Sequence, residues 1–168
     1  MYMAEPGDIL LYRKLQDLEV REIDWVERLK DGRQPYFYYH SSIALDAHTE
    51  IESDGQTVAM KPLAHDGFDA FRPPVPLDSR DAALRFIRTL VGQHYDWVLV
   101  FDDVLRAITH DLVHLPVSFV ESEERHRKIC SSLVVKYLDA TGLQHTLTRN
   151  ALPEDIYLQF KDFQVYTD

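Results

Sequence analysis

Residues 37–54 read Phe-Tyr-Tyr-His-Ser-Ser-Ile-Ala-Leu-Asp-Ala-His-Thr-Glu-Ile-Glu-Ser-Asp. The aromatic and β-branched residues from Phe37 to Leu45 predict a strand. Residues 46–48 fit a short hairpin loop, and Glu50 to Met60 return as a second strand in which Asp54-Gly55 marks a bulge or a turn. This stretch therefore predicts an antiparallel hairpin, around which the rest of the chain is arranged.

The hairpin carries a candidate catalytic base and three acidic residues that can orient it. His40 lies inside the first strand, where a rigid backbone can aim the imidazole. Glu50, Glu52 and Asp54 share one face of the returning strand because side chains alternate with period two. A three-residue loop pairs positions that sum to 94, which places His40 opposite Asp54 and diagonal to Glu52. An even-numbered loop would put them on opposite faces, so the pairing depends on the loop length.

The segments nearest the hairpin predict another strand and a helix. A turn at residues 6–8 precedes the apolar run Ile9–Tyr12, which is typical of a buried strand. Three prolines in residues 66–78 predict an extended connection rather than a regular element. Asp78 or Ser79 then caps a helix whose expected core face is Ala83, Leu84, Ile87, Leu90 and Val91.

The remaining elements are expected to be mainly helical. They are an amphipathic helical insertion at about residues 15–34, an α-rich stretch over 97–112, a helix over 129–138 that ends at Gly142, a last helical turn from Pro153, and a terminal strand over 163–166. No repeat or linker interrupts the pattern. The sequence therefore predicts one α+β domain over residues 1–168.

Cys130 is the only cysteine, so an internal disulfide is impossible. Ser131 and Ser132 follow it and an apolar helical pattern then begins, which predicts Cys130 in the first turn of a helix. Free N–H groups and the helix dipole favour a thiolate there, and the basic cluster 125–128 acts in the same direction. A thiolate nucleophile needs a proton acceptor and donor, for which His40 is the strongest candidate.

The charge composition argues against two classes of binding partner. The chain has 28 acidic and 18 basic residues, a formal net charge of −10, which argues against binding to nucleic acid phosphates or to anionic membranes. The opening residues lack the features of a secretion signal, and no window approaches the roughly 20 apolar residues of a membrane span. We therefore expect a cytoplasmic protein with no nucleic acid partner and no membrane span.

Several motifs together resemble a known family. They are PGDILLY at 6–12, HSSIAL at 40–45, IESDGQTV at 51–58 with KPL at 61–63, GQHYDW at 92–97, ICSSLV at 129–134 and PEDI at 153–156. Their content resembles the NlpC-type papain-like hydrolases. Because the Gly-Asp strand and the histidine precede the cysteine helix, their order resembles the circularly permuted YiiX/YaeF-like branch, to which the lecithin retinol acyltransferase group is related.

The resemblance implies a circularly permuted papain-like fold, in which an antiparallel sheet packs against a cysteine-bearing helix. It implies Cys130 as nucleophile, His40 as base and Glu52 as the residue that orients His40, with Asp54 and Glu50 as rivals. The Cys130 backbone N–H would bind the oxyanion, and Tyr12 is either a second donor or a core residue. No metal or organic cofactor is implied.

The expected function is a thiol hydrolase that cleaves an amide or isopeptide, in a peptidoglycan-type peptide or another cellular amide, through an acyl-enzyme. The alternatives are an acyltransferase or lipid esterase of the same fold, and a non-catalytic binding or virion structural module. The expected partner is a peptide, an amide or a lipid-like acyl substrate. A peptidoglycan substrate would require delivery by a phage virion or a secretion system. The oligomeric state is left open.

Overall fold

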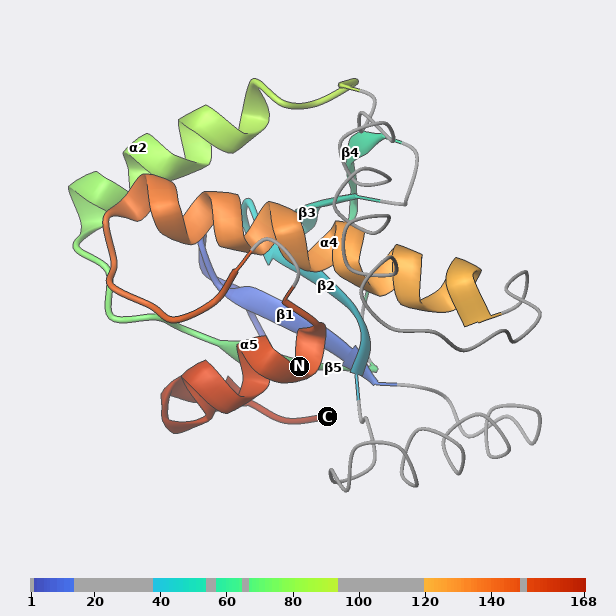
Figure 1. Cartoon of the computed structure of the whole chain (residues 1–168). Helices are drawn as coiled ribbons and strands as arrows, with labels where there is room; N and C mark the ends of the chain where they lie inside the picture. The colour runs from blue at the N-terminus through green and yellow to red at the C-terminus, as the bar shows by residue number, and fades with distance from the viewer. Residues whose placement is uncertain (1, 14–37, 54–56, 65–66, 94–119, 149–150) are drawn as a thin grey trace.

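The computed structural model describes residues 2–13, 38–53, 57–64, 67–93, 120–148 and 151–168 (Figure 1). The elements, in chain order, are β1 Ile9–Arg13, β2 Tyr38–Ala44, β3 Thr49–Ser53, β4 Val58–Pro62, β5 Phe68–Phe71, α2 Leu77–Arg88, α4 Val120–Thr141, α5 Pro153–Phe160, a short 3-10 turn η1 Lys161–Phe163 and β6 Gln164–Tyr166. The α+β class expected from the sequence is confirmed. The expected insertion at 15–34 and the expected helical stretch at 97–112 lie outside the described residues.

The strands form one antiparallel sheet in the order β4-β3-β2-β1-β5-β6. In Figure 1, α4 crosses the sheet, and it packs against β2, β3 and α2. Side chains of α4 are described from Cys130 onward. The cysteine-bearing helix therefore covers the centre of the sheet, where β2 lies.

Alternating side chains separate two apolar clusters. The larger cluster joins the sheet to the helices, and includes Ile9, Leu11, Ile43 and Ile51 together with Leu133, Val134, Tyr137, Leu138 and Ile156. The smaller cluster is built on the alternate strand positions, and includes Leu10, Tyr12, Ala44, Phe68 and Ala70, with Tyr2 and Tyr166 against it. Both faces of β1 and β2 are therefore buried except at Tyr39 and the terminal Arg13, as the continuous apolar run at 9–12 implies.

The hairpin of β2 and β3 has the expected register. Ser42 pairs with Glu52, Ile43 with Ile51 and Ala44 with Glu50, so the paired numbers sum to 94. His40 is consequently diagonal to Glu52, as the three-residue loop predicts. Asp54, which the same register would place opposite His40, lies outside the described residues.

Gly7 and Asp8 hold the start of β1 in place. Asp8 is fully buried and accepts hydrogen bonds from Arg72 Nε at 2.8 Å, Tyr2 Oη at 2.6 Å and the Glu5 backbone N–H at 2.8 Å. Gly7 has φ +90°, and a Cβ there would collide with the Tyr137 hydroxyl. This Gly-Asp pair, part of the family-like pattern, therefore has a structural role.

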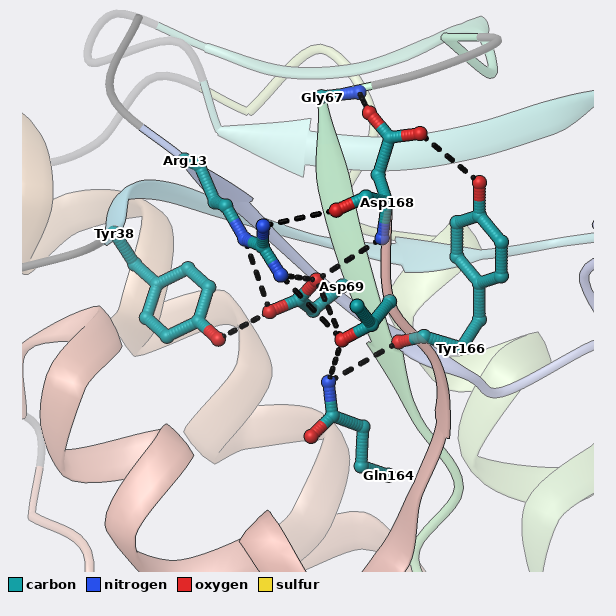
Figure 2. Close-up of polar contacts among 8 residues, drawn as sticks. Arg13, Tyr38, Gly67, Asp69, Gln164, Tyr166 and Asp168 are labelled. Atoms are coloured by element: carbon teal, nitrogen blue, oxygen red, sulfur yellow. Dashed lines mark hydrogen bonds and ion pairs between the residues drawn. The ribbon is translucent and has the colours of Figure 1, made fainter. Parts of the chain in front are cut away.

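A second buried carboxylate ties together chain segments that are distant in sequence (Figure 2). Asp69 of β5 accepts hydrogen bonds from Arg13 Nη2 and Tyr38 Oη, each at 2.5 Å. Thr167 Oγ1 and the Asp168 backbone N–H add bonds of 3.2 and 3.4 Å. Because Arg13 ends β1 and Tyr38 begins β2, Asp69 fixes the end of the sheet that carries His40.

Three expectations about elements were wrong. The connection 66–78 contains strand β5, whose residues precede the three prolines, so those prolines end the strand instead of preventing it. The single returning strand over 50–60 is two strands, β3 and β4, while Asp54-Gly55, expected as a bulge or a turn, lies outside the described residues. Helix α2 begins at Leu77 after Pro76, and neither Asp78 nor Ser79 is its N-cap.

The expected core face of α2 is confirmed at Ala83, Leu84 and Ile87, which are buried. It was wrong at Val91, which is exposed because the helix already ends at Arg88. Gly142, with φ +73°, directly follows α4, as expected of a glycine that ends a helix. The last helical turn and the terminal strand are confirmed as α5 and β6.

Candidate active site

His40 and Glu52 meet on one face of the β2–β3 hairpin. His40 Nε2 lies 2.5 Å from Glu52 Oε2, and both residues are 7% exposed. The contact follows from the register, since diagonal positions on neighbouring antiparallel strands lie within reach of long side chains. Of the two candidates for orienting His40 that the structure describes, Glu50 and Glu52, Glu52 is the one that contacts it, while Asp54 lies outside the described residues.

Cys130 of α4 is fully buried and interacts with β2. Interaction with the His40 side chain and with Ser41 lowers the pKa of its thiol. His40 Nε2 is bound to Glu52, so Nδ1 is the ring nitrogen that this contact does not use. The sequence-predicted trio Cys130, His40 and Glu52 is therefore brought together in the order nucleophile, imidazole, carboxylate.

The charges in this trio support one another. Burial acts to raise the pKa of the Cys130 thiol, but hydrogen bonding to His40 and the charge of His40 outweigh it, so the pKa is lowered. Burial acts to lower the pKa of His40, but its bonds to Cys130 and Glu52 raise it to about 10. Burial acts to raise the pKa of Glu52, but the bonds from His40 and Lys61 lower it to about 2. The site therefore favours a thiolate, an imidazolium and a carboxylate.

Glu50, the rival of Glu52, has different partners. Its carboxylate accepts hydrogen bonds from Tyr12 Oη on β1 and from Ser42 Oγ on β2. Burial raises the pKa of Glu50 despite these two bonds. The Tyr12 hydroxyl therefore donates to Glu50, and Tyr12 packs as a core residue whose ring centroid lies 5.7 Å from that of His40. This geometry favours the core interpretation of Tyr12 over an oxyanion donor.

The predicted position of Cys130 within its helix was wrong. Helix α4 begins at Val120, so ten residues precede Cys130 and its N–H is inside the helix, not at the N-terminus. The charged stretch 121–128 continues the helix because Glu, Arg and Lys are good helix formers. Neither the helix dipole nor a free Cys130 N–H is therefore available at the thiol, and His40 and Ser41 are what lower its pKa.

Sequence reasoning did not assign a role to Lys61. Its ammonium forms an ion pair with Glu52 Oε1, the carboxylate oxygen that His40 does not contact. The signal was present in the hairpin of β3 and β4, where Glu50 pairs with Lys61 and Glu52 with Ala59. A single strand over 50–60 does not bring Lys61 back beside Glu52, so this ion pair does not follow from the strand expected there.

Access to Cys130 is closed in this structure, because none of its surface is exposed. A surface hollow of about 440 Å³ lies elsewhere, beside α5, and is lined by Thr146, Thr148, Asp155 and Gln159 among others. Among the residues that the structure describes, no group of three His, Cys, Asp or Glu side chains is arranged to hold a metal ion. No described helix has the length and apolar character needed to cross a membrane.

Comparison with protein-family models, with curated proteins and with solved structures finds no match to this chain. The site therefore has to be interpreted from its own geometry.

Proposed function

We propose that this chain is a cysteine hydrolase or acyltransferase with a permuted papain-like fold. The observation that carries the proposal is the contact of His40 Nε2 with Glu52 Oε2, together with the interaction of His40 with the Cys130 thiol. Isolated buried cysteines are common in protein cores, but they rarely lie beside a histidine that is itself bound to a carboxylate.

The chemistry assigns one role to each side chain. The Cys130 thiolate attacks an acyl carbonyl carbon, and the carbonyl oxygen takes up the negative charge. As the C–N or C–O bond breaks, the His40 imidazolium gives its proton to the leaving amine or alcohol, and a thioester remains on Cys130. His40 then takes a proton from water, which attacks the thioester and releases a carboxylic acid and the thiolate. An amine or alcohol in place of water gives acyl transfer.

Glu52 is a positioning residue in this scheme. Its carboxylate accepts the Nε2–H of His40, which leaves Nδ1 directed toward the thiol and stabilises the imidazolium. The proposed substrate is an amide or isopeptide, of the peptidoglycan type or another cellular amide. An ester or lipid acyl group is the alternative, since the same thiolate attacks both kinds of carbonyl.

The complete burial of Cys130 favours a second candidate, a binding or structural module without activity. In such a module the trio would be a buried polar network that stabilises the contact between α4 and the sheet. The two candidates differ in whether a reagent reaches Cys130 in the folded protein.

Alkylation by iodoacetamide tests the proposal, because Cys130 is the only thiol. We expect the folded protein to react well below pH ~8.5, the value of a free thiol, and His40→Ala to lose that reactivity at neutral pH. Intact mass spectrometry after incubation with p-nitrophenyl acetate should show one acetyl group on the wild type and none on Cys130→Ser. Reaction only in denaturant would overturn the enzymatic proposal and support the structural module.

A further inference from the structure

The buried carboxylate of Glu52 is held at both oxygens. Oε2 contacts His40 Nε2 at 2.5 Å, and Oε1 forms the ion pair with Lys61 Nζ. The Glu52 side chain is only 9% exposed, whereas that of Lys61 is 45% exposed. One end of this chain of contacts therefore lies inside the protein at Cys130, and the other end reaches solvent at Lys61.

The strand pairing explains why Lys61 reaches Glu52. β4 is an edge strand of the sheet, and its residue Lys61 lies directly opposite Glu50 and diagonal to Glu52 on β3. A long side chain on that face spans the diagonal distance. His40 and Lys61 are the two cationic groups that form ion pairs with Glu52 among the described residues.

Removing the ammonium would leave Glu52 Oε1 in a largely buried place without a charged partner. An unpaired buried carboxylate can take up a proton or rotate away, and either change weakens its hold on His40. An exposed cation that prevents both changes would keep the imidazole in one orientation and one tautomer. The effect of Lys61 on Cys130 is thus indirect, through Glu52 and His40.

We propose that Lys61 is a positioning residue of the site, which holds Glu52 as an oriented carboxylate and through it fixes His40 toward Cys130. The inference rests on the proposed function of the trio and extends the site from three residues to four. Lys61 lies on the edge strand β4, outside the hairpin of β2 and β3. The edge strand therefore also contributes a residue to the site.

Solution NMR tests this inference without any substrate. Spectra of selectively ¹³C-labelled glutamate carboxyl groups and ¹⁵N-labelled histidine rings follow Glu52 and His40 across a pH titration of the full chain. Lys61→Met should raise the Glu52 titration midpoint, while Lys61→Arg, which keeps the charge, should restore it. Lys161→Met is the matched control, because this substitution removes the same charge. Lys161 is exposed and belongs to the short turn η1.

Alkylation gives a second readout. Lys61→Met should slow the reaction of Cys130 at neutral pH by roughly two- to fivefold, the range expected for a partly exposed ion pair, and Lys61→Arg should recover the rate. In the wild type, 1 M salt should raise the titration midpoint of Glu52, because salt screens its ion pair with Lys61. This measurement requires no variant. A folded Lys61→Met protein whose Glu52 and His40 titrations superimpose on the wild type overturns the inference. If wild-type Cys130 proves inert, the enzymatic proposal fails, while the NMR titrations still decide the role of Lys61.

Discussion

His40 Nε2 on β2 and Glu52 Oε2 on β3 lie 2.5 Å apart, and this contact occupies one of the two ring nitrogens of His40. Glu50 lies on the same strand face as Glu52, but its carboxylate is directed to Tyr12 and Ser42. Two glutamates separated by one residue therefore occupy different surroundings. One is ionised beside a cation, and the other is buried with neutral hydrogen-bond donors.

The first prediction compares these two glutamates. Glu52→Gln should lower the pKa of His40, because it removes the negative charge and the hydrogen bond that hold the imidazolium. Glu50→Gln keeps the shape and leaves the His40–Glu52 contact in place, so it serves as the control. A histidine-selective NMR titration measures both. A larger fall in the His40 pKa for Glu50→Gln than for Glu52→Gln would contradict the assignment.

The second prediction concerns the thiol. His40→Ala should raise the pKa of Cys130, because burial then acts without the opposing hydrogen bond and charge of His40. Each unit of increase lowers the thiolate fraction at neutral pH about tenfold. The absorbance of the thiolate near 240 nm, followed against pH, measures it, with Cys130→Ser as the blank. An unchanged titration would show that His40 does not act on the thiol.

The third prediction is the pH dependence of stability. The pKa of His40 is raised to about 10 in the folded protein. The protonated imidazole therefore stabilises the fold fully below the unfolded-state pKa of about 6.5, and this stabilisation is lost as the pH rises toward 10. The pKa of Glu52 is lowered to about 2 in the folded protein. The ionised carboxylate therefore stabilises the fold fully above the unfolded-state pKa of about 4.3, and this stabilisation is lost as the pH falls toward 2. The destabilisation caused by Glu52→Gln should thus be largest between pH ~4.3 and ~6.5. Urea unfolding at a series of pH values measures it, and a flat difference would contradict the coupling.

The fourth prediction concerns Asp69. Asp69→Ala should lower the free energy of unfolding by roughly 3 kcal/mol, because it leaves the buried Tyr38 hydroxyl and the Arg13 guanidinium without their acceptor. Asp162→Ala, at an exposed position of η1, is the control and should leave stability nearly unchanged. Urea denaturation of both variants gives the comparison. Equal midpoints would show that the cluster in Figure 2 contributes nothing.

The fifth prediction separates backbone strain from steric collision at Gly7. Gly7 and Gly67 have similar φ values, +90° and +82°, but an added Cβ meets the Tyr137 hydroxyl and Arg80 at Gly7 and nothing within 4 Å at Gly67. Gly67→Ala should therefore cost about 1 kcal/mol of stability, from strain alone. Gly7→Ala should cost more, since a fully buried tyrosine must also move. Equal losses of stability for Gly7→Ala and Gly67→Ala, measured by thermal unfolding, would show that no steric collision occurs at Gly7.

Some of the candidate site could be predicted because it depends on local chain geometry. The loop 46–48 has an odd number of residues, which fixes the register of β2 and β3 and puts His40 on the same face as Glu52. Cys130 was a candidate because it is the only thiol and is followed by a helical pattern. These inferences needed only side-chain alternation and spacing over about 15 residues.

By itself, then, the sequence determined the α+β class, the register of the central hairpin and the identity of the three candidate residues. Only the tertiary structure decided that α4 starts at Val120, that Glu52 and not Glu50 holds His40, and that Lys61 binds the second oxygen of Glu52. The reason is physical. Register and alternation follow from local bonding, whereas the choice between two carboxylates on one face depends on which partners the neighbouring strands bring against that face.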